Sequence, residues 1–313
     1  MRLRDEPQPV PGPDESLVRV TAVGLCGSDL HWFGEAGIGD AVLRDPLVLG
    51  HEFAGVVEGG PLDGRRVAVD PAISCGACAQ CLSGNRNLCP NVRFAGHGAN
   101  DGGLREYLTW PTRLLVPLPD SISDAGGAVL EPLGVAIHAF DLGHVRVGAS
   151  VAVVGCGPIG LLLVQVALAA GAATVVAVDP LPHRLEAAQS YGAVPVPDAV
   201  PEVDVAFEVA GADDAVRTAM RAARPGARVV LAGIPANDAT TFPAGLARRK
   251  GLSLVLVRRM KDVYPRAIRL VEQGHVDVDS LVTHRFPLER AQEAFVSASA
   301  RVGLKCLVEP QRV

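Results

Sequence analysis

The sequence lacks an excess of positive charge. Its 313 residues carry 29 Lys and Arg against 34 Asp and Glu, which gives a net charge of -5 and a pI near 5.9. No polybasic run is present, so the composition argues against a nucleic-acid partner and against an anionic membrane surface. The opening residues, MRLRDEPQPVPGPDES, lack the apolar stretch of a secretory signal. We therefore expect a reducing, cytoplasmic setting.

Charge is missing altogether between Val151 and Val178, a stretch longer than the roughly 20 residues that cross a bilayer. Glycines and a proline interrupt this stretch early, at 155–160, and Gly171 interrupts it again. Its two flanks, VAVV and TVVAV, are β-branched and typical of strands. The segment is predicted to fold as strand, turn, buried helix, turn and strand, and not as a membrane helix.

Apolar residues make up 49% of the chain, which is enough for two ordinary domains. Residues 1–137 contain short β-like runs separated by Gly and Pro, with no long amphipathic helix evident, which predict a β-rich lobe of barrel type. Residues 138–274 alternate strand-like and helical patterns, which predict a doubly wound α/β domain with a parallel sheet. Residues 275–313 end in a short helix and a closing strand that we expect to complete the first domain.

Four cysteines lie within fifteen residues, at Cys75, Cys78, Cys81 and Cys89. This spacing predicts a tetrahedral zinc site made of four thiolates. Such a site leaves no open position for a substrate, so the metal would be structural. Disulfides or scattered core cysteines are the alternatives, and the tight spacing without a secretory signal disfavours both.

A glycine-rich turn follows the strand-like VAVV and opens a helical pattern, as Gly155-Cys-Gly157-Pro-Ile-Gly160. In this context the glycines predict a dinucleotide site, with the pyrophosphate at the helix N-terminus. Asp179 ends the next strand, where a carboxylate can bond the ribose hydroxyls and repel a 2′-phosphate, so NAD is favoured over NADP. The predicted cofactor-binding residues are Gly155, Gly157, Pro158, Ile159, Gly160, Asp179 and Arg184.

A thiol, an imidazole and a carboxylate stand away from the cysteine cluster, at Cys26, His51 and Glu52. Each lies at the edge of a β-like run, where loops carry chemistry. Together they could form a three-ligand zinc site with a vacant position. Taken alone these residue types are weakly specific, because a solitary Cys or His more often packs in a core.

Across these motifs the sequence resembles the zinc-dependent medium-chain dehydrogenase/reductase family, and its polyol (sorbitol-type) dehydrogenases most of all. The resemblance implies a GroES-like catalytic domain built from both ends of the chain around a Rossmann domain, assembled as homodimers or homotetramers. The resembling stretches are CGSDLH at 26–31, GHE at 50–52, the four-cysteine segment, DGGLREY at 101–107, EPLGVAIHA at 131–139, GCGPIG at 155–160 and VTHRFPLE at 282–289.

The resemblance also implies which residues hold the catalytic zinc. Cys26 and His51 would be ligands, and either Glu52 or Glu131 would be the carboxylate that reaches the metal directly. Asp29 would hold the distal nitrogen of His51. With the four-cysteine site this makes two zinc ions per chain.

Two further residues acquire roles by the same resemblance. Ser28 would form a hydrogen bond with the substrate hydroxyl, and His31 would pass the proton of that hydroxyl toward solvent. Polyol dehydrogenases often carry an Arg-Tyr pair beside the site; here Arg259 or Arg258 could match the arginine, and Met260 replaces the tyrosine.

The predicted reaction is oxidation of a secondary alcohol of a polyol or sugar derivative to a ketone by hydride transfer to NAD, with zinc as the Lewis acid. A threonine-type amino-alcohol dehydrogenase or an idonate-type sugar-acid dehydrogenase is the enzymatic alternative. A zinc- and nucleotide-binding sensor or partner module is the non-enzymatic one.

Overall fold

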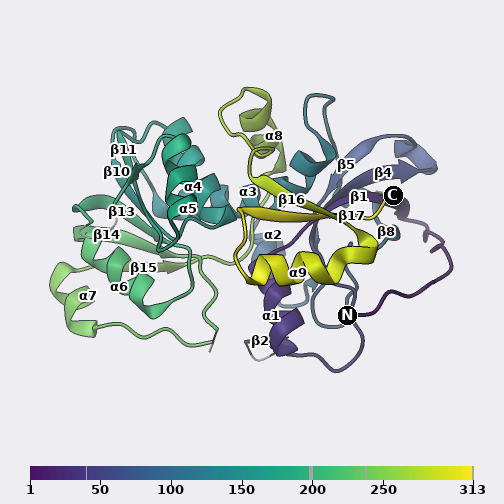
Figure 1. The fold of residues 1–313 in the computed structure, drawn as a ribbon, viewed down its shortest axis with the longest axis horizontal. Coiled ribbons are helices and arrows are strands. Elements are labelled where there is room, and N and C mark those ends of the chain that lie inside the picture. Colours follow the sequence, from purple (N-terminus) through teal and green to yellow (C-terminus); the bar gives the residue numbers. More distant parts are fainter. Residues whose placement is uncertain (40, 197–199, 237, 312–313) are drawn as a thin grey trace. The chain divides into compact units, whose positions relative to one another are not determined.

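The computed structural model describes residues 1–39, 41–196, 200–236 and 238–311, and the chain divides into two compact units. Both ends of the chain belong to unit 1 (Figure 1). The sequence-based limits after residues 137 and 274 remain a prediction of the domain boundaries. Unit 1 comprises Met1–Glu131, Tyr264–Glu272 and Val278–Val313, and unit 2 comprises Pro132–Val263 and Gln273–Asp277.

Unit 1 is built on a seven-stranded sheet in the order β16-β17-β1-β4-β5-β9, with β8 also paired to β1. Alternate side chains of β1, such as Val18 and Val20, are fully buried and pack with Phe53 and Trp110. This alternation gives the sheet one core face. The strands are β1 (Glu15–Gly24), β4 (Glu52–Glu58), β5 (Arg66–Val69), β8 (Tyr107–Pro111), β9 (Leu115–Pro117), β16 (Val282–Pro287) and β17 (Lys305–Glu309), beside the short pairs β2 (Gly37–Ile38) with β3 (Ala41–Val42) and β6 (Ala72–Ile73) with β7 (Arg93–Phe94).

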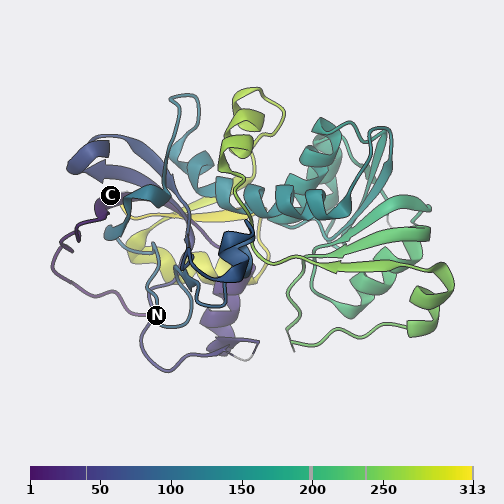
Figure 2. The ribbon, with the colours of Figure 1, turned by 180° about the vertical axis from the view of Figure 1, so that it is seen from behind.

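The end of the chain, from Val278 on, belongs to unit 1. β17 pairs antiparallel with β1 through Gly24 and Leu307, and β16 pairs parallel with β17. Helix α9 (Ala291–Ser299) buries Phe295 in a cluster with Trp32 of α1 (Gly27–Glu35). Figure 2 shows these yellow C-terminal segments beside the purple first strand and helix.

One long helix begins before residue 137, and it is apolar rather than amphipathic. Helix α3 (Asp124–Gly143) begins there and runs for 20 residues through Pro132. Its glycines weaken helix propensity but permit close packing, because a Cβ at Gly127 would lie 2.5 Å from Leu118. Tertiary contacts therefore stabilise a helix that local sequence disfavours. Unit 1 also contains α2 (Ala79–Leu82), α8 (Tyr264–Glu272), η1 (Gly60–Leu62), η2 (Arg86–Leu88), η3 (Thr112–Leu114) and η4 (Leu288–Arg290).

Unit 2 is a parallel sheet in the order β12-β11-β10-β13-β14-β15, which confirms the doubly wound prediction. The chain steps outward from β10 to β12 and then returns to β13, so right-handed crossovers place α4 and α6 on opposite faces. The elements are β10 (Ser150–Val154), α4 (Pro158–Ala169), β11 (Thr174–Val178), α5 (Pro182–Ser190), β12 (Val194–Pro195), β13 (Val203–Glu208), α6 (Asp213–Ala222), β14 (Ala223–Leu231), α7 (Ala244–Lys250) and β15 (Ser253–Leu256).

The uncharged stretch from Val151 to Val178 folds as strand, helix and strand, as predicted. Across the described ranges, no helix is both long and apolar enough to cross a membrane.

Candidate active site and metal centres

Cys26, His51 and Glu52 come together in unit 1. One ligand atom from each lies within 4.8 Å of the others. Cys26 caps α1 just after β1, and Glu52 opens β4. Because β1 and β4 are antiparallel and Gly24 is registered opposite Glu52, the end of one strand lies beside the start of the other.

Asp29 fixes the histidine of this cluster. Its carboxylate is fully buried and accepts hydrogen bonds from the backbone N–H of Cys26 at 3.0 Å and of Gly50 at 3.2 Å. The same carboxylate lies 3.4 Å from Nδ1 of His51. Burial disfavours both charges, yet their attraction lowers the pKa of Asp29 and raises the pKa of His51 well above its usual value. This contact leaves Nε2 of His51 as the nitrogen available to a metal.

Glu131 is buried on α3, outside the three-residue cluster of ligand atoms. Burial raises the pKa of Glu131 to about 7, His51 opposes that rise, and the Glu52 carboxylate adds to it. A cation between the two carboxylates would relieve this repulsion. The role of Glu131 as a direct metal ligand remains a prediction.

Lys305 is a site residue that sequence reasoning missed. It lies on β17 with 2% of its surface exposed, forms an ion pair with Glu52, and donates a hydrogen bond from Nζ to the carbonyl oxygen of Leu25 at 2.9 Å. Burial opposes its charge, but the neighbouring Glu52 and Cys26 raise the pKa of Lys305. The sequence feature that could have identified Lys305 is its position in the closing strand KCLV, where a lysine precedes three apolar residues.

Gly24 makes room for this ion pair. A Cβ there would overlap the Glu52 carboxylate and lie 3.0 Å from Cε of Lys305. The absence of a side chain on β1 therefore lets a side chain of β4 meet one of β17 across it.

The donor set fits zinc. Thiolate, imidazole and carboxylate are the usual ligands of a catalytic zinc with three protein ligands. Glu131 and Asp29 add buried acidic groups nearby, while Lys305 supplies a single ammonium ion. The surplus of buried acid is the electrostatic setting that a divalent cation compensates.

Ser28 and His31 lie on α1 beside this cluster in sequence, and both are half-buried. Nδ1 of His31 lies 3.1 Å from a carboxylate oxygen of the exposed Glu35 one turn later. The structure thus gives His31 a partner at the solvent side of the helix.

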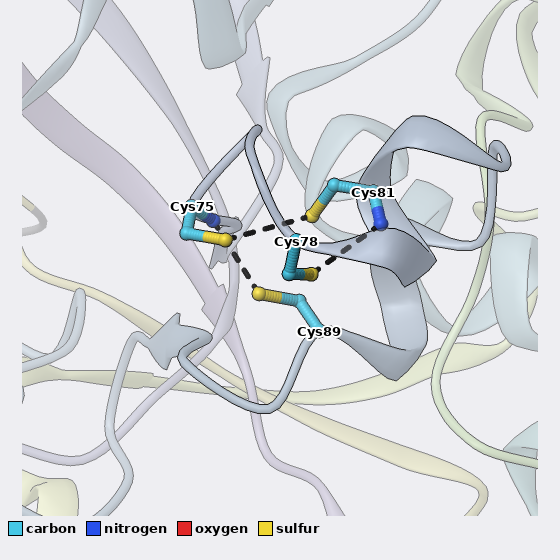
Figure 3. A group of neighbouring side chains, drawn as sticks. All are labelled: Cys75, Cys78, Cys81 and Cys89. Atoms are coloured by element: carbon cyan, nitrogen blue, oxygen red, sulfur yellow. Dashed lines mark hydrogen bonds between the residues drawn. The ribbon is translucent and has the colours of Figure 1, made fainter.

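The four cysteines form a second cluster, shown in Figure 3, with all four sulfurs within 4.8 Å of one another. The sulfurs of Cys75 and Cys81 are 4.0 Å apart, close to the roughly 3.8 Å edge of a tetrahedral zinc–thiolate site. All seven cysteines lie within the described residues, and none of them is in a disulfide there. Backbone N–H groups, that of Ala77 first, lower the pKa of the Cys75 thiol to about 6. The cluster fits the closed structural site predicted from its spacing.

An ion pair fastens the four-cysteine segment to the sheet. Arg86 of η2 donates to the Asp70 carboxylate at 2.6 Å, at the end of β5. The backbone N–H of Cys75 donates to the sulfur of Cys89 at 3.4 Å, which ties the two ends of the segment together.

The glycine-rich turn lies between β10 and α4 in unit 2, as predicted. Gly155 has φ of 101°, a conformation that favours glycine, and Gly157 caps α4 with Pro158 as the first residue. A Cβ at Gly160 would overlap the carbonyl oxygen of Gly155, so only glycine allows this close packing. Ile159 lies in the first turn of α4.

Asp179 follows β11 and is 8% exposed. One of its oxygens accepts from the backbone N–H of Cys156 at 2.7 Å and the other from Leu181 at 2.9 Å. Arg184 of α5 approaches the turn, with Nη1 3.7 Å from the position of a Cβ on Gly157. The predicted cofactor residues therefore gather at one end of the parallel sheet.

The arginines that could match an Arg-Tyr pair differ in burial. Arg258 is exposed and Arg259 is half-buried with φ of 55°. Met260 is buried in unit 2, where a Cβ on Gly134 would lie 2.5 Å from its sulfur.

The chain is similar to known dehydrogenases over nearly its whole length. Residues 12–120 match the alcohol dehydrogenase GroES-like domain, and residues 158–273 match the zinc-binding dehydrogenase model. A sorbitol dehydrogenase of Bacillus subtilis (strain 168) is 35% identical over 334 residues, covering 99% of this chain and 95% of that protein.

Two solved structures extend the similarity to the fold. L-idonate 5-dehydrogenase from Escherichia coli has a TM-score of 0.89 and 31% identity, covering 95% of this chain and 91% of that one. A putative zinc-binding dehydrogenase from Sinorhizobium meliloti 1021, bound to NADP, has a TM-score of 0.89 and 33% identity, covering 98% of this chain and 95% of that one.

Proposed function

Because the chain belongs to the zinc-binding dehydrogenases with a GroES-like domain, we propose that it oxidises a secondary alcohol of a polyol or sugar derivative to a ketone. The observation that carries this proposal is the cluster of Cys26, His51 and Glu52 amid surplus buried acid. Its similarity to sorbitol dehydrogenases supports the polyol substrate class. The alcohol loses a hydride to the oxidised nicotinamide and a proton to the protein, so one ketone and one reduced cofactor form per turnover.

Cys26, His51 and Glu52 would hold the catalytic zinc, with Glu131 as an additional or alternating carboxylate. Bound zinc would supply Lewis acidity that makes the substrate hydroxyl easier to deprotonate, and a bound dinucleotide would supply the hydride acceptor. Asp29 keeps His51 in the tautomer and orientation that a metal requires.

The remaining site residues handle the proton. Ser28 would accept the hydrogen bond of the reacting hydroxyl, and His31 would take the proton onward. The contact between His31 and the exposed Glu35 supports an exit toward solvent.

We infer NAD as the cofactor, bound by the turn from Gly155 to Gly160 together with Asp179 and Arg184. The Asp179 carboxylate disfavours a 2′-phosphate by charge, although one similar structure holds NADP and another holds NADH. Replacing Asp179 with Ser should raise kcat/KM for NADP relative to NAD; an unchanged ratio would contradict this assignment.

We also infer two zinc ions per chain, one in each cluster. Cysteines that bind zinc as thiolates, together with the buried thiols of Cys156 and Cys306, favour a reducing, cytoplasmic setting. The outer edge of strand β15 in unit 2, unpaired among the described strands, could pair with the same strand of a second copy, and Leu256 on it is 75% exposed. These two features support a homodimer or homotetramer. Metal analysis and sedimentation would test these statements.

The test is turnover with NAD and a panel of sugar alcohols, followed by NADH absorbance. Wild-type protein should reduce NAD with a polyol, while Cys26→Ala should lose turnover and retain NADH binding. Adding L-idonate to the panel separates the sugar-acid alternative, which the similarity to L-idonate 5-dehydrogenase favours. No turnover with any hydroxylated substrate after zinc repletion would favour a binding module instead.

A further inference from the structure

Glu208 is a buried acid with no part in the chemistry proposed above. It is the last residue of β13, near the middle of the parallel sheet, and only 1% of its surface is exposed. A carboxylate in such a place is costly unless hydrogen bonds compensate it. Burial raises the pKa of Glu208, and the surrounding N–H groups oppose that rise.

The Glu208 carboxylate fastens the loop that follows β13. One of its oxygens accepts from the backbone N–H of Ala210 at 2.8 Å and of Gly211 at 2.6 Å. These bonds fold the chain back immediately after the strand, just before α6 begins at Asp213. Hydrogen bonds to a carboxylate therefore help to hold the loop 209–212.

The same residue holds the loop that follows the next strand, β14. The backbone oxygen of Glu208 accepts from Ala232 at 2.8 Å and Gly233 at 3.2 Å. Its carboxylate would be 2.8 Å from a Cβ on Gly233, so the two loops meet at this side chain. Gly211 has φ of 71° and a Cβ there would overlap the carbonyl oxygen of Ile234, so the loops touch through glycines.

The first of these loops also packs against the dinucleotide turn. A Cβ on Gly155 would lie 2.9 Å from the backbone nitrogen of Ala210, and a Cβ on Gly160 would lie 3.1 Å from Cγ2 of Val209. β10 and β13 are neighbours in the sheet, and the strand order reverses between them. Ligands of open parallel sheets bind in the crevice outside the carboxyl ends of the strands at such a reversal.

We propose that Glu208 is a positioning residue for the dinucleotide, which holds the loops 209–212 and 232–235 in the shape that receives the cofactor beside the turn at Gly155. It contacts backbone groups and not the reacting atoms. This inference rests on the proposed dinucleotide-dependent function.

The test variant is Glu208→Gln, which keeps the size of the side chain. It removes the negative charge and replaces one accepting oxygen with an amide N–H₂, which cannot accept a hydrogen bond from the surrounding backbone N–H groups. The matched control is Asp204→Asn. Asp204 lies on the same strand, and its carboxylate likewise accepts from a backbone N–H, that of Ser150 at 2.8 Å. It lies toward the amino end of β13, away from the dinucleotide turn.

NADH binding is measured by fluorescence titration, with zinc content and the thermal midpoint of each variant beside it. We expect Glu208→Gln to weaken NADH binding about ten- to hundredfold, the effect of losing a charge-assisted hydrogen bond. Zinc content and KM for the polyol should remain those of the wild type. Asp204→Asn should lower the thermal midpoint and leave the Kd for NADH unchanged.

The results separate positioning from stability. Wild-type affinity in Glu208→Gln, or equal weakening in both variants, would overturn the inference. If Glu208→Gln does not fold, Glu208→Asp replaces it, because the shorter acid keeps the charge but draws the carboxylate away from the N–H groups of Ala210 and Gly211, and the same weakening is expected. Absence of NADH binding by the wild type would instead refute the proposed function.

Discussion

The ion pair between Lys305 and Glu52 gives the sharpest prediction about stability. Both side chains are almost fully buried, at 2% and 1% exposure. Lys305→Met removes the ammonium ion and leaves the Glu52 carboxylate without its partner, and the carbonyl of Leu25 loses a donor. Breaking a buried pair from one side costs about 3–5 kcal/mol, or two to four powers of ten in the folding equilibrium.

Bound zinc should reduce the loss of unfolding free energy that Lys305→Met causes. A divalent cation held by Cys26, His51 and Glu52 compensates the same carboxylate, so the ammonium ion matters less when the metal is bound. We expect the loss caused by Lys305→Met to be about 3–5 kcal/mol in chelator and at most half of that with zinc. Lys305→Met/Glu52→Gln should recover much of the loss in chelator, because no buried charge is then left unpaired.

The chain offers a direct assay for this difference. Its two tryptophans, Trp32 and Trp110, are both buried in unit 1, so their fluorescence during urea unfolding reports the unit that contains the ion pair. Arg217→Met, which removes an exposed ion pair with Asp214 in unit 2, should leave that transition unchanged. Equal destabilisation by Lys305→Met with and without zinc would refute the reasoning.

Three further outcomes are expected. Gly24→Ala should lower zinc affinity and the tryptophan-detected stability of unit 1, because the added Cβ overlaps the Glu52 carboxylate; retained affinity in metal titrations would contradict this. Cys89→Ser should reduce bound zinc from two to one per chain by metal analysis while NADH binding persists, whereas a loss of both zinc ions would show that the clusters are not independent. The Ser150 N–H and Arg224 lower the pKa of Asp204 below its ordinary value of 3.8, so its stabilisation is present above that pH and is lost as pH falls through the lower folded value. The difference in unfolding free energy between wild type and Asp204→Asn should therefore be constant near neutrality and shrink below about pH 4.

Much of the site followed from local sequence. The spacing of Cys75, Cys78, Cys81 and Cys89 predicts a closed cluster because all four ligands come from one short segment. The turn from Gly155 to Gly160 is equally local, since strand, glycines and helix are contiguous. The cluster of Cys26, His51 and Glu52 required the family resemblance, because the residue types are common and the two segments are separated in sequence.

Other features escaped sequence reasoning for identifiable reasons. Helix α3 contains Pro132 and several glycines, so its local propensity is poor and packing decides its conformation. Lys305 lies 253 residues after Glu52, and only the pairing of β17 with β1, and of β1 with β4, brings them together. Glu208 looked like the end of an ordinary strand, because its partners are backbone groups of loops whose course no side-chain pattern encodes.

The sequence by itself determined the candidate metal-binding segments, the alternating pattern of unit 2 and the candidate ligands, because each depends on residue types at short spacing. The tertiary structure decided how buried charges are compensated. Asp29 meets His51 and Lys305 meets Glu52 across segments distant in the chain, and Glu208 bonds both to the loop that directly follows it and to the loop after β14. Charge compensation depends on distances of a few ångströms in three dimensions, and only the pairing of strands sets those distances.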